Sequence, residues 1–443
     1  MMNQTDTLIE FCEALTLEDV PDEAKDHARL SLLNAVGATL GGLSSDATRI
    51  ATQQMEILGG LPQAHIYGTA DMTSVDRAGL VNGIAAHVLD FDDTHIPTVY
   101  HPTAPLMASI VPLAEYLGAT GAEFFRAWIV GLEGGMRLAN ALGRSHYDLG
   151  WHITSTAGYV AAAFSSAVLL GLDRTSTRHA LGIAATQSSG HRQQFGAMTK
   201  SFHAGMAGSG GVTAALLAQA GYTADSESIH GRRGLLSVMS PQPDPDALVH
   251  DLGEQWVLRE NCLKPYASGV VTHPLIDVGR SMRDEYKLSV DDIAAVRLRV
   301  NPLVIELTNI PVAATGLEGK FSVRHCLAAG FVDGRGGPEQ FTDDRVIAPD
   351  IVAIRDRVSV EDGGLPPMQA IAEVTLGDGQ VIEIEIVRAR GTMTRPLTVE
   401  EVNEKFHNLA DAAIGELAAK ALFHAVQDLE TGPFVRLVEA TGR

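Results

Sequence analysis

The sequence predicts a mainly α fold: a large all-α domain formed by the N- and C-terminal segments, with an inserted smaller α+β lid domain. Apolar residues recur at the helical period of three and four positions in much of 7–220 and again in 399–429. Between these parts, 294–300, 370–376 and 381–387 show the pattern of strands. An aromatic share of 5% beside 44 glycines favours closely packed helices. The predicted division is 1–261 with 396–443 for the all-α domain, and 262–395 for the α+β domain.

Each predicted helix is a periodic stretch bounded by turn residues such as Gly118–Gly121 and Gly171–Asp173. Residues Gly377–Gln380 separate the last two predicted strands and indicate a hairpin. In order, the predicted helices are 7–17, 22–42, 76–90, 104–118, 121–142, 154–170, 173–186, 198–220, 322–333 and 399–429.

Charge and composition exclude several classes of protein. The net charge of −21 argues against a nucleic-acid partner, and it means that an anionic substrate needs a local basic pocket. The three cysteines are scattered, which argues against a disulfide framework or a clustered iron–sulfur site. The N-terminal residues lack a basic and an apolar region of the kind that signal peptides carry, and no long apolar run occurs. We therefore expect a cytoplasmic protein without a membrane partner.

The densest group of ionisable residues is 87–102, between the periodic stretches 78–89 and 104–117. Acids, imidazoles and a hydroxyl at a helix-to-loop junction suit proton transfer. The alternative is a solvated acidic loop with Asp93 or Thr94 as a helix N-cap. Two histidines and the flanking helices favour a site. Along the whole chain the candidate groups are Asp90, Asp93, Thr94, His95, His101, His152, Arg192, Lys200, His203, Lys264 and His273.

Three of these candidates stand in informative surroundings. His152 directly precedes a predicted helix, whose N-terminus favours an anion and lowers the pKa of an imidazole. Lys200 and His203 are three residues apart and share one helix face. Lys264 lies where the chain enters the second domain, and ligand sites often lie between domains. Asp92 is interpreted as a helix or loop cap.

Other chemistries fit the sequence less well. Asp90–Thr94 matches the D-x-D-x-T pattern of aspartate-nucleophile phosphatases, but that motif follows a buried strand and 82–89 has a helical pattern. No H-E-x-x-H or Cys/His spacing supports a metal site, and no G-x-S-x-G supports a serine hydrolase. The glycines of 205–211 fit neither phosphate-binding pattern.

Several motifs in order resemble those of the MmgE/PrpD family, whose members include 2-methylcitrate dehydratase, cis-aconitate decarboxylase and iminodisuccinate epimerase. The resemblance covers about 7–430. It implies an all-α domain with an inserted α+β lid domain, a homodimer, and a site between the domains. The motifs are Leu89–His95 with His101-Pro102, Gly150-Trp151-His152, Met198–Gly205, Lys264-Pro265-Tyr266 with Thr272-His273-Pro274, and Lys320-Phe321-Ser322 with Cys326.

By this resemblance, six residues match pocket positions of cis-aconitate decarboxylase: Asp90, Thr94, His101, His152, Lys200 and Lys264. The chain departs from that enzyme at two positions. Gly269 stands where the decarboxylase has a further pocket histidine, and His325 stands where it has a tyrosine. Both departures argue against cis-aconitate decarboxylation and leave dehydratase-like or epimerase-like chemistry open.

We therefore predict a lyase of the 2-methylcitrate dehydratase type, without cofactor or metal, that removes water from a small di- or tricarboxylate. The alternatives are epimerisation of an iminodisuccinate-like dicarboxylate, cis-aconitate-type decarboxylation, and a non-catalytic carboxylate-binding dimeric scaffold. The predicted catalytic residues are Asp90, His101, His152, Lys200 and Lys264. The predicted substrate-binding residues are Asp93, Thr94, His95, Arg192, His203, His273 and His325.

Overall fold

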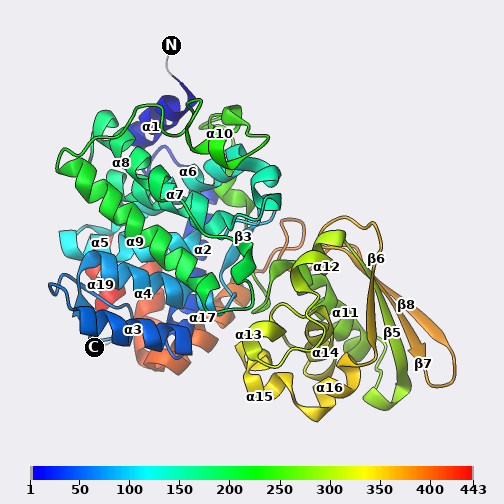
Figure 1. Cartoon of the computed structure of the whole chain (residues 1–443). Helices are drawn as coiled ribbons and strands as arrows, with labels where there is room; N and C mark the ends of the chain where they lie inside the picture. Colours follow the sequence, from blue (N-terminus) through cyan, green and yellow to red (C-terminus); the bar gives the residue numbers. More distant parts are fainter. Residues whose placement is uncertain (1–2, 442–443) are drawn as a thin grey trace.

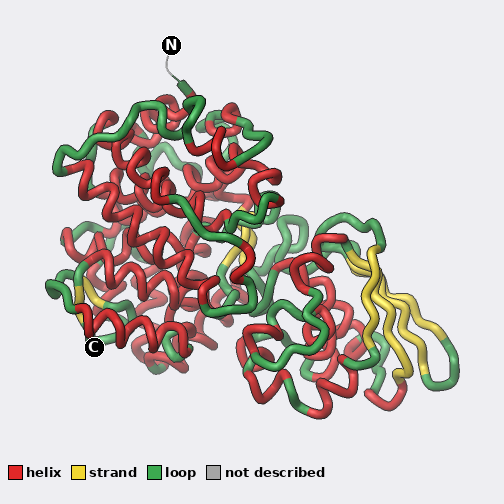
Figure 2. The backbone as a smooth tube through the Cα atoms, viewed as in Figure 1, coloured by secondary structure: helices red, strands yellow, loops and turns green. Residues whose placement is uncertain are grey.

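The computed structural model describes residues 3–441; residues 1, 2, 442 and 443, which the predicted all-α domain includes, lie outside the described residues. Figure 1 shows two bodies, a larger one built of helices from both parts of the chain and a smaller one that ends in a sheet. Helices dominate the backbone, and most of the strand residues gather at the outer side of the smaller body (Figure 2). The mainly α fold class is thereby confirmed.

The larger body contains most of the helices. Its first part consists of α1 Gln4–Ala14, α2 Asp22–Gly42, α3 Asp46–Leu58, α4 Val75–Val88, α5 Thr103–Leu117, α6 Gly121–Asp148, α7 Ile153–Leu169, α8 Arg174–Gln187, α9 Thr199–Gln219 and α10 Leu235–Met239. Its last part consists of α17 Val399–Ile414, α18 Glu416–Gln427 and α19 Val435–Glu439. Two short ribbons are added by β1 Ala64–His65 with β2 Met72–Thr73, and by β3 Asp93–His95 with β4 Asn261–Leu263.

Small residues let the central helices α4, α5, α7 and α9 approach closely. A Cβ atom on Gly83 of α4 would lie 2.6 Å from the Cα atom of Gly205 on α9. At the other end of the chain, α17 packs on α2, where a Cβ atom on Gly37 would lie 3.2 Å from the Cα atom of Phe406. The C-terminal helices therefore complete the body that the N-terminal helices begin.

The smaller body places helices on one face of a four-stranded sheet. The strands β5 Ile293–Val300, β6 Val358–Asp362, β7 Ala370–Leu376 and β8 Val381–Ile386 have the order β6-β5-β7-β8, with β5 parallel to β6 and the other pairs antiparallel. Alternate residues of β7 are buried, and α11 packs on β7 and β8. The helices are α11 His273–Asp284, α12 Pro302–Thr308, α13 Gly316–Gly319, α14 Val323–Val332, α15 Asp343–Val346 and α16 Pro349–Arg355.

The structure corrects some predicted elements. The predicted helix 399–429 is two helices, since Gly415 has φ 84°, outside the helical region. The helix predicted at 76–90 ends at Val88, before the polar turn. The helix predicted to end at 142 continues to Asp148 through a kink at Gly143. Helix α3 was not predicted; of its residues only Thr48 is buried.

Among the helices of residues 3–441, none combines the length and the apolar character needed to cross a membrane.

The contact between α4 and α9 gives a test of the packing. Gly83→Ala places a methyl group against the backbone of Gly205, which has no flexible side chain to yield. We expect a loss of about 1–3 kcal/mol in the free energy of unfolding, measured by chemical denaturation. Gly377→Ala is the matched control, because no atom lies within 4 Å of its added Cβ. Equal effects of the two substitutions would contradict this account.

Candidate functional site

A short ribbon joins two segments that are far apart in the sequence. Strands β3 and β4 pair antiparallel, with Asp93 opposite Leu263 and His95 opposite Asn261. The pairing continues by one more bond, because the backbone N–H of Lys264 donates to the carbonyl of Asp92 at 3.2 Å. The residue that follows β4 is therefore placed beside the residues that precede β3, and Lys264 meets the polar turn at 89–92.

The turn at 89–92 is held by two buried lysines that the predicted site did not include. Lys320 Nζ donates to the carbonyls of Leu89 and Ala267, at 2.5 and 2.8 Å. Lys405 Nζ, from α17, donates to the carbonyls of Phe91 and Lys264, at 2.6 and 2.8 Å. Each lysine thus links the turn to the segment 264–267. Lys320 belongs to the motif Lys320-Phe321-Ser322 given above, but nothing in the sequence around Lys405 indicated burial.

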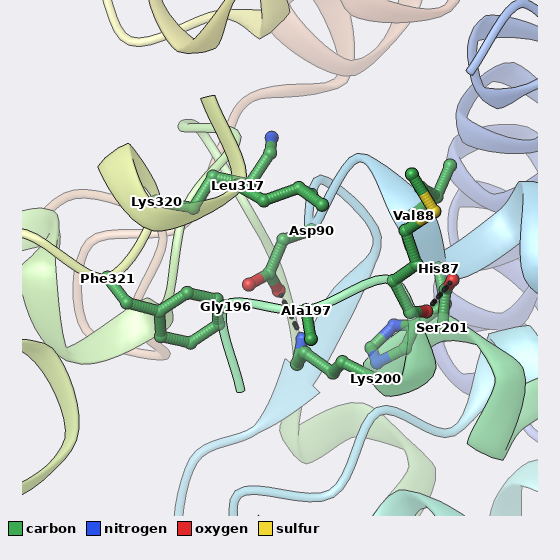
Figure 3. Close-up of a pocket in the computed structure, with 11 residues that line it drawn as sticks. His87, Val88, Asp90, Gly196, Ala197, Lys200, Ser201, Leu317, Lys320 and Phe321 are labelled. Carbon is green, nitrogen blue, oxygen red and sulfur yellow. Dashed lines mark hydrogen bonds and ion pairs between the residues drawn. The ribbon is translucent and has the colours of Figure 1, made fainter. Parts of the chain in front are cut away.

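Asp90 lies at the centre of this arrangement. It is buried and has φ 51°, a conformation in which aspartate and asparagine are more frequent than most residues. Its Oδ1 atom lies 3.0 Å from Lys200 Nζ and also accepts a hydrogen bond from Lys264 Nζ. Figure 3 shows Asp90 and Lys200 directed toward each other. Asp90 Oδ2 is buried and has no hydrogen-bond partner among the described residues.

The ion pairs fix the charges of these groups. Burial raises the pKa of Asp90, but the ammonium groups of Lys200 and Lys264 outweigh burial and hold this pKa well below its ordinary value. Burial lowers the pKa of Lys264, but Asp90 and Asp92 more than offset it, so that this pKa is raised. For Lys200 burial dominates and its pKa is lowered. Asp90 is therefore a carboxylate at neutral pH, and Lys200 is the more acidic of its two partners.

Three buried imidazoles stand next to the ion pairs. The ring centroid of His87 lies 4.9 Å from that of His101 and 5.8 Å from that of His152. Burial, together with nearby cations, lowers the pKa of each. All three rings are therefore neutral at pH 7, and each offers one N–H donor and one acceptor nitrogen.

The hydrogen bonds of His101 define which of its nitrogens is the acceptor. Its Nδ1 lies 2.5 Å from the carbonyl oxygen of Asp93 and 3.1 Å from Thr94 Oγ1. A carbonyl only accepts, so Nδ1–H donates and Nε2 carries the lone pair. His87 is oriented in a similar way, because its Nδ1 lies 2.6 Å from the carboxylate of Asp92. The Nε2 atoms of His87 and His152 are buried without a partner in the described part of the chain.

Two neighbouring carboxylates have different partners. Asp92 is no cap: its carboxylate binds His87 and lies 3.5 Å from Lys264 Nζ. Asp93, predicted to bind substrate, accepts hydrogen bonds from Thr103 and Asn261. Burial and the charge of Asp92 raise the pKa of Asp93 to about 7. Successive residues of an extended segment face opposite sides, which explains why Asp92 and Asp93 have different partners.

Three predicted substrate-binding histidines lie outside the cluster. His95 uses both ring nitrogens, toward Thr98 and Glu260. His325 faces the carbonyl of Gln340 within the smaller body. His273 is buried with its Nε2 3.4 Å from the carbonyl of Ser268. None of the three lines either of the cavities described next, so the structure does not support a role in substrate contact for them.

Two cavities adjoin at Asp90, Lys200 and Phe321. The first lies between the two bodies: Leu317, Lys320 and Phe321 come from one side and the remaining residues from the other (Figure 3). Its lining is His87, Val88, Asp90, Gly196, Ala197, Met198, Lys200, Ser201, Leu317, Lys320 and Phe321. The second is lined by Asp90, Val99, His101, Tyr147, Phe195, Lys200, Gly269, Val270, Val271, Leu307, Thr308 and Phe321.

Arg192 lies beside the second cavity. Its guanidinium is 4.3 Å from the ring centroid of Tyr147, and its Nη2 atom pairs with Glu306 of α12 at 2.9 Å. Its Nε and Nη1 atoms are buried and have no hydrogen-bond partner among residues 3–441. A buried donor without a partner is costly, and such a group favours a ligand that accepts hydrogen bonds.

Two groups of side chains have the spacing to hold a metal ion. One nitrogen each from His87, His101 and His152 lie within 4.8 Å of one another, and the same holds for ligand atoms of Asp90, Asp92 and His101. The predicted independence from metal therefore stays a prediction. The phosphatase alternative is excluded, because Asp90 follows a helix and not a buried strand.

Comparisons with known proteins cover most of the chain. A family model described as the MmgE/PrpD N-terminal domain matches residues 6–248, and one described as the MmgE/PrpD C-terminal domain matches 266–431. A cis-aconitate decarboxylase of Homo sapiens is 24% identical, over 96% of this chain and 92% of that protein. A cis-aconitate decarboxylase-like protein, oryM, of Aspergillus oryzae is 24% identical over 97% of this chain and 95% of that protein. A cis-aconitate decarboxylase of Aspergillus terreus is 24% identical over 96% of this chain and 93% of that protein.

Removing the charge of Asp90 tests its central position. Asp90→Asn tolerates the positive φ but removes the carboxylate charge that the two buried ammonium groups share. We expect a loss of about 3–5 kcal/mol in the free energy of unfolding. Asp148→Asn, in an exposed ion pair with Arg144, should change it by less than about 1 kcal/mol. Similar values for the two variants, measured by denaturant titration, would show that the Asp90 pairs do not stabilise the fold.

The buried histidines predict a dependence of stability on pH. Burial lowers the pKa of His273 from 6.5 to about 3. The unfolded chain therefore binds a proton below pH 6.5 that the folded chain does not, and stability is lost as pH falls from 6.5 toward 3. His273→Gln should reduce the slope of unfolding free energy against pH between 6.5 and 4 by up to about 1.4 kcal/mol per pH unit. The exposed His250→Gln is the control and should leave the slope unchanged.

Proposed function

The chain belongs to the MmgE/PrpD family, and on that premise we propose that it is a lyase that removes water from a small di- or tricarboxylate without a cofactor. One observation carries the proposal: buried ammonium groups and neutral imidazoles meet at Asp90, on the shared wall of two cavities. Such an elimination needs cations for the substrate carboxylates, a base for the proton on carbon, and an acid for the departing hydroxyl.

The cations are present in a chain that is otherwise acidic. Lys200 lines both cavities, and Arg192 has two buried donors without a partner in the described residues, next to the second cavity. In our proposal Lys200 neutralises the carboxylate beside the reacting carbon, and Arg192 binds a second carboxylate. A carboxylate that binds Arg192 also competes with Glu306, so the second cavity would accept a dianion in preference to a monoanion.

His101 is the proposed base. It lines the second cavity, it is neutral, and its Nδ1 donates to the carbonyl of Asp93, which leaves Nε2 free to take a proton. Lys200 is the proposed acid, because burial lowers the pKa of its ammonium group. Asp90 does not suit the role of the acid, since its pKa lies well below the ordinary value and it remains a carboxylate.

Decarboxylation is the second candidate, favoured by the relatives, which are named as cis-aconitate decarboxylases. The same cations would bind cis-aconitate, and Lys200 would supply the proton that replaces CO₂. Gly269 lies in the wall of the second cavity, and a Cβ atom there would meet Phe321 at 3.4 Å. Room at this position, where the resemblance places a histidine of the decarboxylase, is our reason to rank dehydration first.

Product analysis separates these candidates. Pure protein is incubated with 2-methylcitrate, citrate, cis-aconitate and iminodisuccinate. Dehydration gives an enoate absorbance without CO₂; decarboxylation gives CO₂; epimerisation gives solvent deuterium in the substrate without loss of water. No change in any of the four would contradict the enzyme proposal and favour a carboxylate-binding scaffold. Activity that disappears with EDTA would instead indicate a metal ion at one of the two groups that have metal-ligand spacing.

Substitutions of Lys200 test its two proposed roles. Lys200→Met removes both charge and proton, and we expect kcat to fall by at least about 100-fold. Lys200→Arg keeps the charge but cannot give up a proton at neutral pH, so it should retain KM within about threefold while kcat stays low. Lys420→Met, at an exposed lysine, is the control and should keep full activity. Full kcat in Lys200→Arg would limit the role of Lys200 to electrostatics.

A further inference from the structure

Four imidazoles form a series from the second cavity to the surface. His101 lines that cavity, and its ring centroid lies 6.3 Å from that of His152. His152 and His203 share a hydrogen bond, with 2.9 Å between their Nδ1 atoms. The ring of His203 lies 6.5 Å from that of His191, an exposed residue. The series begins in the buried site and ends in solvent.

The local structure explains how these rings come together. His152 stands at the N-cap of α7, and its backbone N–H donates to the carbonyl of Gly190 at 3.1 Å. That bond brings the residue after Gly190, His191, beside α9. His203 follows Lys200 by three residues on α9, so one face of this helix presents the ammonium group to Asp90 and the imidazole to His152.

The hydrogen bond between two imidazoles has a specific consequence. Burial and the neighbouring His203 lower the pKa of His152, and burial with His87 and His191 lowers the pKa of His203 to about 4. Both rings are neutral, so one Nδ1 donates and the other accepts. Such a pair can pass a proton by exchanging these roles, since each ring accepts at one nitrogen and releases at the other.

We propose that His152, His203 and His191 form a proton relay that connects His101 with solvent. The inference rests on the proposed lyase function. During elimination the C–H electron pair forms the C=C bond, the C–O pair leaves with the hydroxyl, and a proton from Lys200 completes the water molecule. His101 then carries one proton too many and Lys200 one too few. The relay moves the proton from His101 to solvent, and Lys200 recovers one from solvent through the first cavity.

The relay accounts for features that a purely structural role leaves unexplained. His152 lines neither cavity, yet its Nε2 atom is buried without a partner in the described residues. One nitrogen of His152 lies within 4.8 Å of one nitrogen of His101, a separation that a single bridging water spans. The titratable groups that face the pair of His152 and His203 are Lys200, His87 and His101. All carry positive charge or none, which favours release of a proton outward.

The exposed end of the relay gives the cleanest test. His191→Asn removes the last imidazole at an exposed position, where it should not disturb the fold. We expect kcat to fall roughly tenfold, less than the loss of a group that transfers a proton in the chemical step itself, with KM unchanged, and we expect added imidazole to restore it. His250→Asn, an exposed histidine outside the series, is the control and should be neither slowed nor rescued. An unchanged kcat in His191→Asn, or a loss that imidazole does not restore, would overturn the relay.

A second measurement needs no turnover. In the protein without substrate, nitrogen-15 NMR of labelled histidines follows exchange with water of the proton between His152 and His203. His191→Asn should slow this exchange by about tenfold or more, and His250→Asn should not. Equal exchange rates in the two variants would overturn the relay even if no substrate is found. Absence of turnover with slowed exchange would overturn the lyase proposal and leave the relay standing.

Discussion

The arrangement depends on one buried carboxylate shared by two buried ammonium groups. Taking three charges out of water costs several kcal/mol for each, and their attraction repays the cost only if the geometry is held closely. The rest of the site supplies that geometry. The β3–β4 ribbon places Lys264 beside the turn, α9 presents Lys200, and the positive φ of Asp90 turns its carboxylate toward both.

The ion pairs of Asp90 with Lys200 and Lys264 also set the protonation state of the imidazoles around them. Because Lys200 and Lys264 keep their charge near Asp90, they oppose a further positive charge on the imidazoles, which burial already disfavours. A site that holds cations and neutral imidazoles side by side can stabilise negative charge and accept protons at the same pH. Two more lysines, Lys320 and Lys405, hold backbone carbonyls of the turn and thereby keep it from relaxing when charge develops.

Sequence periodicity predicts the helices and strands whose formation depends on residues close along the chain. Helix α2 and strand β7, for example, have the predicted bounds. Periodicity did not predict the three-residue strand β3, and it interpreted Asp92 as a cap, whereas the Asp92 carboxylate binds His87. Burial of a lysine depends on contacts with distant segments, which explains why Lys320 and Lys405 were missed. His95 and His325 were chosen for their residue type, and their partners, Glu260 and Gln340, could not be read from spacing.

The two bodies contribute different things to the second cavity. Asp90, His101 and Lys200, which would move charge and protons, come from the helical body, whereas Gly269, Leu307 and Thr308 on the opposite wall come from the smaller body and cannot titrate near neutral pH. A substitution in that wall changes the volume and shape offered to a substrate without altering the ion pairs around Asp90. In the proposed mechanism the reacting groups therefore come from the larger body, and the wall that the smaller body provides would select among carboxylates.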